Sequence, residues 1–268
     1  MLCAGGTLVT SLAGCVGGNV TTDEPTMSDQ STETDGDGTA TETEGTDRGV
    51  RLIGHRGCAD QYPENTLLAV RESAPHVDMI EIDVQRCGSG ELVVFHDDEL
   101  DRLTDATGSV STTDWETLSE LTVLDSDQGI PLLAELLAAV PADTAVNVEL
   151  KHEGIADEVL EAAGGVDNEV LFSSFSPTAL RELRERDADA PLAFVTNESP
   201  GISRSIATDL DCVAINPDYR MVLGTSFVAD AHDEGLAVNT WTIDDAETAE
   251  RVIDAGVDGL FVDRWDVV

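Results

Sequence analysis

Short apolar runs recur along the chain from residue 50 to its end, and polar segments separate them. Nine such runs are candidate strands, because each is five to eight residues long and many are rich in Val, Ile and Phe. They span residues 50–55, 79–85, 91–96, 144–151, 169–175, 191–196, 211–217, 236–243 and 259–263. Strands of this composition are typical of a parallel sheet whose faces are covered by helices.

Segments with helical periodicity lie between most of these runs and carry start and stop signals. In the segment FSPTALRELRER, Ser176 is a candidate N-cap and Pro177 occupies the first helical position. Further along, Asp244 and Glu247 form a capping-box pattern, and Gly256 stands where the same helix should end. The chain is therefore predicted to alternate between strand and helix.

This alternation, in about 220 residues, predicts a (β/α)8 TIM barrel. An open sheet is disfavoured because the GxGxxG fingerprint after a first strand is absent. Two intervals break the rhythm. Residues 86–90 are too few for a helical crossover, so the second and third runs must connect irregularly. Residues 97–129 are polar with weak periodicity, and predict a small insertion after the third strand, over one mouth of the barrel.

The first 48 residues differ in composition from the predicted barrel domain, residues 49–268. Residues 1–15 are small and apolar, too few to span a bilayer, and end in LAGC, which resembles a lipobox with Cys15 as the lipidated residue. No Arg or Lys precedes this run. Residues 16–48 are rich in Thr, Glu, Asp, Ser and Gly, as in a disordered acidic linker. We expect an extracytoplasmic protein, anchored to the membrane through Cys15 or secreted.

The formal net charge of -40 at pH 7 narrows the possible partners. A chain this acidic repels nucleic acid, so no nucleic-acid partner is expected. The 41% hydrophobic content favours a folded protein that works at high salt over an acidic disordered chain. The five cysteines show neither zinc-site nor disulfide-framework spacing. Asn19 and Asn197 lie in N-x-[ST] sequons.

Acidic residues interrupt two of the apolar runs in the same way. Residues two apart in a strand point to one face, so Glu81 and Asp83 share a face, and Glu149 and Lys151 repeat the arrangement on a separate strand. Neighbouring carboxylates inside a barrel repel each other and desolvate badly unless a positive charge joins them. Glu81, Asp83 and Glu149 are therefore candidate ligands of a hard divalent cation, Mg²⁺ or Ca²⁺. The alternative is that they face solvent.

Two histidines each end a predicted strand. His55 follows the first apolar run and His96 closes the third, where barrel strands deliver catalytic groups. Two imidazoles near a carboxylate cluster predict a pair of acid/base catalysts. The other histidines, His76, His152 and His232, lie in loop or helix context and are interpreted as structural.

The order of several motifs resembles that of the glycerophosphodiester phosphodiesterases, which are PLC-like phosphodiesterases with a TIM-barrel fold. The motifs are HRGCADQYPENT, EIDV, VVFHDDEL, VELK, LFSSFSP, INPDY, NTWTIDD and GVDGLFVD. HRG followed by PENT, ExD, FHD and ELK is a specific combination. The resemblance covers residues 50–263, and it implies metal-dependent hydrolysis of glycerophosphodiesters to glycerol 3-phosphate and an alcohol.

The resemblance also implies roles for single positions. The two strand-ending histidines become the acid and base, and the three carboxylates become the metal ligands. Arg56 and Lys151 would face the phosphate, Glu64 would support the first loop, and Trp241 would line the glycerol side. Lys151 is the only lysine of the chain. Because a lysine is a compact point charge and an arginine is a planar fork, we expect the two to differ at a crowded phosphate site.

Two alternatives stay open from the sequence. Related barrels act on lysophospholipids or phosphoinositides, so a lysophospholipase D-like activity is the first. The second is a non-catalytic binding lipoprotein on an inactive barrel, which the complete set of expected residues disfavours. The acidic, lysine-poor composition is similar to that of haloarchaeal lipoproteins.

Overall fold

The computed structural model describes residues 49–268. The predicted lipidation signal with Cys15, the acidic linker and the sequon at Asn19 lie outside the described residues, so they stay predictions. Among residues 49–268, every helix is too short or too polar to cross a membrane.

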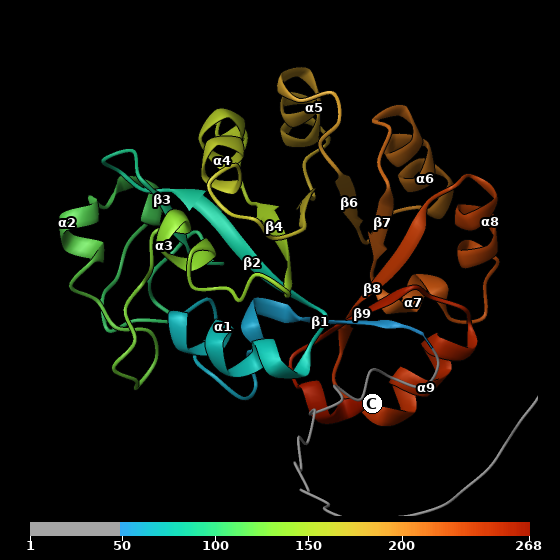
Figure 1. The fold of residues 1–268 in the computed structure, drawn as a ribbon, viewed down its shortest axis with the longest axis horizontal. Coiled ribbons are helices and arrows are strands. Elements are labelled where there is room, and N and C mark those ends of the chain that lie inside the picture. Colours follow the sequence, from blue (N-terminus) through green and yellow to red (C-terminus); the bar gives the residue numbers. More distant parts are fainter. Residues whose placement is uncertain (1–48) are drawn as a thin grey trace, which may run out of the picture. The chain divides into compact units, whose positions relative to one another are not determined.

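Eight parallel strands close into a barrel (Figure 1). They are β1 (Arg51–Gly54), β2 (Met79–Arg86), β4 (Ala145–Leu150), β5 (Val170–Ser174), β6 (Leu192–Thr196), β7 (Ala214–Pro217), β8 (Ala237–Ile243) and β9 (Gly259–Val262). The strands follow one another around the barrel in chain order, and β1 closes it by pairing with both β9 and β2. The predicted (β/α)8 TIM barrel is confirmed.

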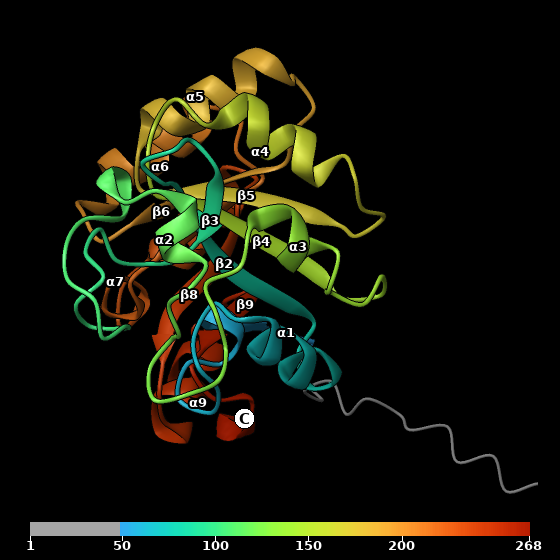
Figure 2. The ribbon, with the colours of Figure 1, turned by 90° about the vertical axis from the view of Figure 1, so that its left-hand side faces the viewer.

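Helices lie outside the strands, as Figures 1 and 2 show from two sides. They are α1 (Leu67–Ser73), α2 (Trp115–Leu118), α3 (Leu133–Leu137), α4 (Ala156–Ala163), α5 (Pro177–Arg186), α6 (Pro200–Asp209), α7 (Tyr219–Val222), α8 (Phe227–Asp233) and α9 (Ala246–Asp254). Four 3-10 turns complete the regular structure of residues 49–268, at His55–Gly57, Ala74–His76, Val110–Thr112 and Trp265–Val267. Most connections between strands therefore contain a helix, as a parallel barrel requires.

The sequence signals at the helix ends agree with the structure in all but one detail. Ser176 is the N-cap of α5, and its hydroxyl accepts a hydrogen bond from the backbone N–H of Ala179 at 3.3 Å. Gly256 has a φ of 90° directly after the end of α9, where glycine avoids the cost of a left-handed backbone. The predicted capping box of Asp244 and Glu247 was wrong, because the N-cap of α9 is Asp245, whose side chain accepts from the backbone N–H of Thr248.

The third apolar run forms β3 (Leu92–Val94), which pairs antiparallel with the end of β2. The predicted irregular connection is confirmed, since five residues allow a hairpin but no crossover. After β3 the chain leaves the barrel for the insertion, which here denotes residues 97–130, and it carries α2. Figure 1 shows the insertion beside β3, at one side of the barrel.

The insertion buries more apolar surface than its polar composition predicts. Together with Cys87, Val93 and Phe95 it forms a hydrophobic cluster, separate from the cluster between the barrel strands and their helices. The buried members of this insertion cluster are Cys87, Val93, Phe95, Leu100, Leu103, Val110, Leu118, Val123 and Ile130. Apart from Val93 in β3 and the turns at 110–112 and 115–118, these residues lie in irregular chain, and the sequence therefore shows no helical or strand period for them.

Candidate active site

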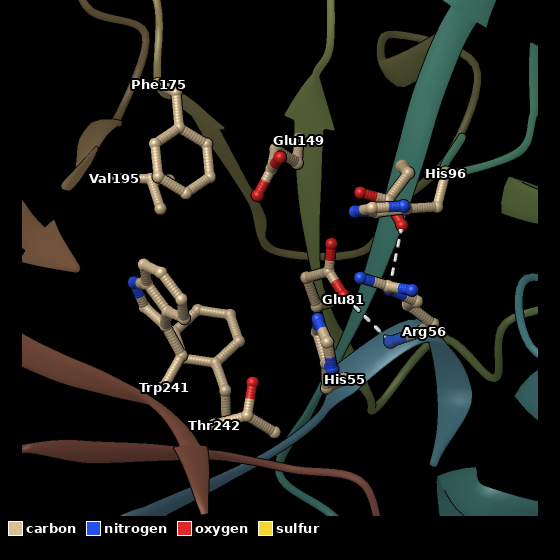
Figure 3. A pocket seen from close by; sticks show the side chains of 11 residues that line it. His55, Arg56, Glu81, His96, Glu149, Phe175, Val195, Trp241 and Thr242 are labelled. Carbon is tan, nitrogen blue, oxygen red and sulfur yellow. Dashed lines mark hydrogen bonds and ion pairs between the residues drawn. The ribbon is translucent and has the colours of Figure 1, made fainter. Parts of the chain in front are cut away.

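The three predicted metal ligands lie together at the carboxyl ends of β2 and β4. The two strands are paired, with Asp83 opposite Glu149, so the i, i+2 spacing of Glu81 and Asp83 brings all three side chains to one place. One oxygen atom from each carboxylate lies within 4.8 Å of the others, and all three residues are buried. Figure 3 shows Glu81 and Glu149 pointing into the same pocket.

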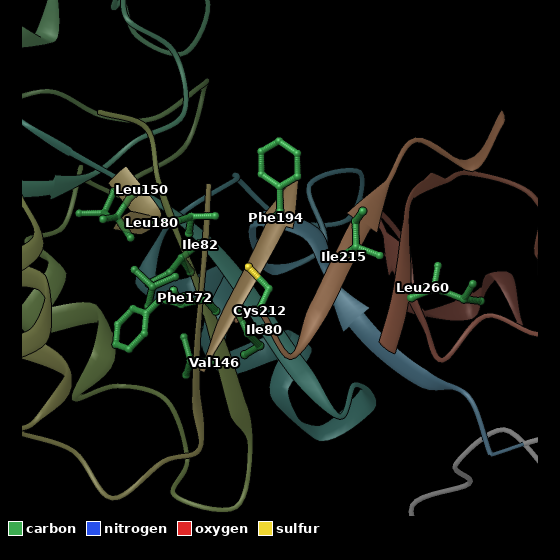
Figure 4. Packing of buried hydrophobic residues seen from close by; sticks show 14 of the residues in the cluster. Ile80, Ile82, Val146, Leu150, Phe172, Leu180, Phe194, Cys212, Ile215 and Leu260 are labelled. Atoms are coloured by element: carbon green, nitrogen blue, oxygen red, sulfur yellow. The ribbon is translucent and has the colours of Figure 1, made fainter. Parts of the chain in front are cut away.

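The neighbouring residues of the same strands point the other way. Ile80 and Ile82 pack in the cluster outside the barrel strands with Val146 and Phe172 (Figure 4). Near the amino ends of the strands the barrel interior is apolar, and a separate cluster that includes Ile53 fills it. Strand alternation and this apolar layer together confine the carboxylates to one mouth of the barrel.

Two cationic side chains contact the acidic cluster. Lys151 follows β4, and its Nζ lies 2.8 Å from Glu149 Oε1 and 3.3 Å from Asp83 Oδ1. Arg56 has a left-handed φ of 52°, and its backbone N–H donates to Glu81 Oε2 at 2.7 Å, while its Nε lies 3.5 Å from Asp83 Oδ2. The predicted juxtaposition of these cations with the three carboxylates is therefore present.

One carboxylate of the cluster, that of Glu81, is not balanced by the neighbouring positive charges. Burial, together with the charge of Asp83, raises the pKa of Glu81 to about 8. Asp83 is equally buried, but Lys151 and Arg56 outweigh the desolvation and lower its pKa to about 2. Glu81 Oε1 is also buried without a hydrogen-bond partner among the described residues. An unpartnered oxygen beside two further carboxylates is the donor set that a hard divalent cation binds.

Both strand-ending histidines line this pocket, and each ring is fixed by a carboxylate. His55 Nδ1 lies 2.6 Å from Asp263 Oδ1, and His96 Nδ1 lies 2.6 Å from Asp97 Oδ1. Because an ionised carboxylate only accepts, each Nδ1 donates, which leaves Nε2 as the free ring nitrogen. Burial lowers the pKa of His55, but the hydrogen bond with Asp263 and the charge of Glu81 outweigh it, so the pKa is raised.

Sequence reasoning did not identify Asp263 and Asn65 as site residues. Asp263 is the last residue of the final predicted strand and directly follows the observed β9, so the rule that marked the two histidines, each at the end of a predicted strand, would have found it. Asn65, within the PENT motif, donates from Nδ2 to Asp83 Oδ2 at 2.8 Å, and its Oδ1 accepts from the Asp83 backbone N–H. It orients the carboxylate at the centre of the cluster.

Glu64 has the supporting position that the resemblance implied. Its buried carboxylate accepts from Arg56 Nη1 at 2.9 Å. It also accepts from Arg102 of the insertion, from Nη1 at 2.7 Å and from Nη2 at 2.9 Å. Burial alone would raise the pKa of Glu64, but the two guanidinium groups outweigh it and lower the pKa. Arg102 was not identified from the sequence.

The opposite wall of the pocket is apolar. Trp241 lies there with its Nε1 donating to the backbone oxygen of Asn216 at 2.8 Å, and its ring packs edge-on against Phe175, with centroids 5.6 Å apart. Val195 and Phe261 complete this wall, and the pocket measures about 130 Å³. Figure 3 shows the aromatic rings facing the charged groups across the pocket, so a bound molecule meets one polar and one apolar side.

The other histidines and the cysteines among residues 49–268 take no part in this site. His76 stacks on Trp265 with ring centroids 4.0 Å apart. The other two histidines are paired with carboxylates, His152 with Asp98 at 3.3 Å and His232 with Asp258 at 2.8 Å. Cys58, which follows the HRG motif, is buried, and burial raises the pKa of its thiol to about 12, so it is not a nucleophile.

The comparisons with known proteins agree with this architecture. A model of the glycerophosphoryl diester phosphodiesterase family matches residues 55–267. A glycerophosphodiester phosphodiesterase of Caldanaerobacter subterraneus is 30% identical over 230 residues, which cover 79% of this chain and 93% of that protein. A phosphodiesterase of Oleispira antarctica, solved in complex with its product sn-glycerol-3-phosphate, is 29% identical with a TM-score of 0.73, over 80% of this chain and 92% of that one.

A second solved structure, the glycerophosphodiester phosphodiesterase of Thermotoga maritima, is 26% identical with a TM-score of 0.70, and covers 81% of this chain and 96% of that one. The family match includes both strand-ending histidines and all three carboxylates of the cluster. The resemblance drawn from the sequence motifs is thereby confirmed, and this chain belongs to the glycerophosphoryl diester phosphodiesterase family, a class of phosphoric diester hydrolases.

Proposed function

We propose that this protein hydrolyses glycerophosphodiesters to glycerol 3-phosphate and an alcohol with a divalent cation, and that His55 and His96 are its acid and base. The observation that carries the proposal is one pocket in which both imidazoles lie beside a buried cluster of three carboxylates. Each ring is held at Nδ1, so each presents the nitrogen that exchanges protons.

Glu81, Asp83 and Glu149 would hold the cation. Their close oxygens, and the buried Oε1 of Glu81 without a partner, support this assignment among the described residues. An all-oxygen donor set suits Mg²⁺ or Ca²⁺. When bound, such a cation neutralises charge on a phosphate ester and polarises its P–O bonds.

The protein's own cations would orient the phosphate. A phosphodiester is negatively charged and gains charge in the transition state, so a pocket walled by carboxylates excludes it without compensation. Arg56 offers a guanidinium fork for two phosphate oxygens, and Lys151 offers a point charge beside the cluster. Both side chains are largely enclosed, 16% exposed each, so little solvent screens them.

Proton transfer would be divided between the histidines. One imidazole takes the proton from the attacking oxygen, which is either water or the glycerol 2-hydroxyl, and the other gives a proton to the leaving alkoxide. Asp263 and Asp97 keep the rings in one tautomer during both steps, because each accepts from Nδ1.

A glycerol-bearing substrate is supported from two sides. The Oleispira antarctica neighbour was solved with sn-glycerol-3-phosphate. In this chain, Trp241 and Phe175 form an apolar wall against which the carbon chain of a glycerol packs when its phosphate lies by the cations. Lysophospholipids, the alternative substrates, share the glycerophosphate core and differ in the acyl chain.

We also propose that the enzyme acts outside the cytoplasm. The LAGC sequence at Cys15 supports lipidation, and the acidic residues 16–48 support a tether between the lipid and the barrel. Metabolic labelling with a radioactive precursor of the host's own membrane lipids tests this directly. The proposal requires label in the wild type and none in Cys15→Ser, and label that persists in the variant would overturn it.

The enzymatic proposal is tested with the purified protein at high salt. We expect release of glycerol 3-phosphate from glycerophosphocholine, loss of this activity with EDTA, and recovery with Mg²⁺ or Ca²⁺. A lysophospholipid panel run in parallel identifies the preferred class. Full turnover after exhaustive chelation would overturn metal dependence, and turnover of lysophospholipids alone would overturn the substrate assignment.

A further inference from the structure

Arg102 of the insertion holds two carboxylates that belong to two different catalytic loops. Its Nε and Nη2 donate to Asp97 at 2.7 and 2.8 Å, and its Nη1 and Nη2 donate to Glu64 at 2.7 and 2.9 Å. A guanidinium that makes two-pronged contacts with both carboxylates uses its planar fork fully, which no lysine reproduces. Such geometry fixes the relative position of the two acids.

Each of these carboxylates has a second partner that lines the pocket. Asp97 Oδ1 lies 2.6 Å from His96 Nδ1, and Glu64 Oε1 accepts from Arg56 Nη1 at 2.9 Å. The five residues therefore form one continuous network of ion pairs, in the order Arg56, Glu64, Arg102, Asp97, His96. Only its two ends line the pocket, and Arg102 at its centre does not.

The two ends of this network come from segments that the barrel joins indirectly, through β2, with which both β1 and β3 pair. Arg56 follows β1, His96 follows β3, and these two strands are not paired with each other. Each loop is hydrogen-bonded to β2 separately, and Arg102 links the two loops to each other directly. Such a direct link restrains their relative position, because loops are the more mobile parts of a fold. Shifts of about 1 Å at a reacting group are enough to lower turnover about 10²-fold.

We infer that Arg102 is a positioning residue that sets His96 and the phosphate-facing Arg56 in register with each other. The inference rests on the proposed function, since it takes His96 as an acid/base group. No residue of the insertion lines the pocket. Through Arg102 the insertion nevertheless helps to position the catalytic groups. The network is anchored, since Glu64 is buried.

The test compares two substitutions of Arg102 with a matched control. Arg102→Lys keeps the charge and loses the fork, and Arg102→Gln loses both. Arg51 is the control, because its side chain is 42% exposed against 47% for Arg102, it forms an ion pair with Glu169, and it lies at the other mouth of the barrel. We expect kcat to fall about 10²-fold in both Arg102 variants and to stay unchanged in Arg51→Lys.

Two further measurements separate positioning from a simple stabilising contact. Guanidinium ions at concentrations that leave the fold intact should restore kcat in Arg102→Gly, and urea at the same concentration should not. NMR of protein labelled with ¹⁵N-histidine should show the Nδ1–H resonance of His96, assigned with His96→Gln, shifted or lost in Arg102→Gln and unchanged in Arg51→Lys.

The outcomes distinguish this inference from the proposed function. A wild-type rate in Arg102→Gln, or a reduced melting temperature with normal kcat and an unchanged His96 resonance, would overturn the positioning role. A wild-type protein that releases no glycerol 3-phosphate would overturn the proposed function, and the NMR measurement would still report whether Arg102 holds the ring.

Discussion

Lys151 is the most informative residue to change, because it is the only lysine of the chain and contacts two carboxylates of the cluster. We consider Lys151→Met, which removes the charge and keeps much of the side-chain volume. The lost contacts are those of Nζ with Glu149 Oε1 at 2.8 Å and with Asp83 Oδ1 at 3.3 Å. Burial lowers the pKa of Lys151, but these two carboxylates outweigh it, so the ammonium is stabilised in its charged form.

The magnitude follows from these distances. With an effective dielectric constant of about 20, the pairs at 2.8 and 3.3 Å contribute about 6 and about 5 kcal/mol before desolvation. Desolvation offsets most of this, and removal of one partner from a buried pair costs about 3 to 5 kcal/mol. Since the side chain is 16% exposed, we take about 3 kcal/mol. For a domain of this size, that lowers Tm by about 6 to 12 °C.

The assay is thermal unfolding with and without a divalent cation. In EDTA, Lys151→Met should lose the full amount, because Glu149 and Asp83 are left with less positive charge. A bound cation supplies the missing charge, so the difference from the wild type should narrow when Mg²⁺ or Ca²⁺ is added. The control is Arg86→Met, which breaks an exposed pair with Glu158 and should change the free energy of unfolding by about 1 kcal/mol or less.

Turnover measurements separate the effect of the positive charge at position 151 from the effect of the shape of the side chain. Lys151→Arg keeps the positive charge, so Tm should stay near that of the wild type. The larger planar group cannot take the place of a point charge between Glu149 and Asp83, and we expect turnover to fall about 10²-fold. Unchanged turnover in Lys151→Arg would refute the specific need for lysine. A Tm of Lys151→Met equal to that of the wild type in EDTA would refute the electrostatic reasoning.

Two other predictions concern the imidazoles and the unpartnered carboxylate. His55→Ala and His96→Ala should each lower turnover of glycerophosphocholine about 10²- to 10⁴-fold in steady-state assays, and near wild-type rates in both would disprove their roles. In EDTA, stability should fall as pH rises through the window from about 4.3 to about 8, because folded Glu81 has a raised pKa and binds more protons there than the unfolded chain. Unfolding curves across this range should show a slope of at most about 1.4 kcal/mol per pH unit from this group, and Glu81→Gln should flatten it. An equal slope in the variant would contradict the assignment.

The carboxylate cluster was predictable because it follows from strand geometry. Glu81, Asp83 and Glu149 interrupt apolar strands with a period of two, and the carboxyl ends of neighbouring parallel strands meet at one mouth of a barrel. The same rule located His55 and His96. Local pattern and barrel topology were sufficient to bring these groups together.

The pairing of side chains that are far apart in the sequence was not predictable in this way. His55 and Asp263 are 208 positions apart, and only closure of the barrel by β1 and β9 brings them to 2.6 Å. Arg102 lies in a stretch without secondary-structure period, so nothing in the sequence indicates that its guanidinium turns back toward Glu64. Irregular chain acquires its structure from tertiary contacts rather than from local propensity.

The insertion cluster packs separately from the cluster between the barrel strands and their helices, so the two can vary in sequence independently. Substitutions among its members within residues 97–130 should leave the packing between the barrel strands and their helices unchanged, since none of them belongs to that cluster. The guanidinium of Arg102 is a constraint on this variation, because it contacts carboxylates of both catalytic loops.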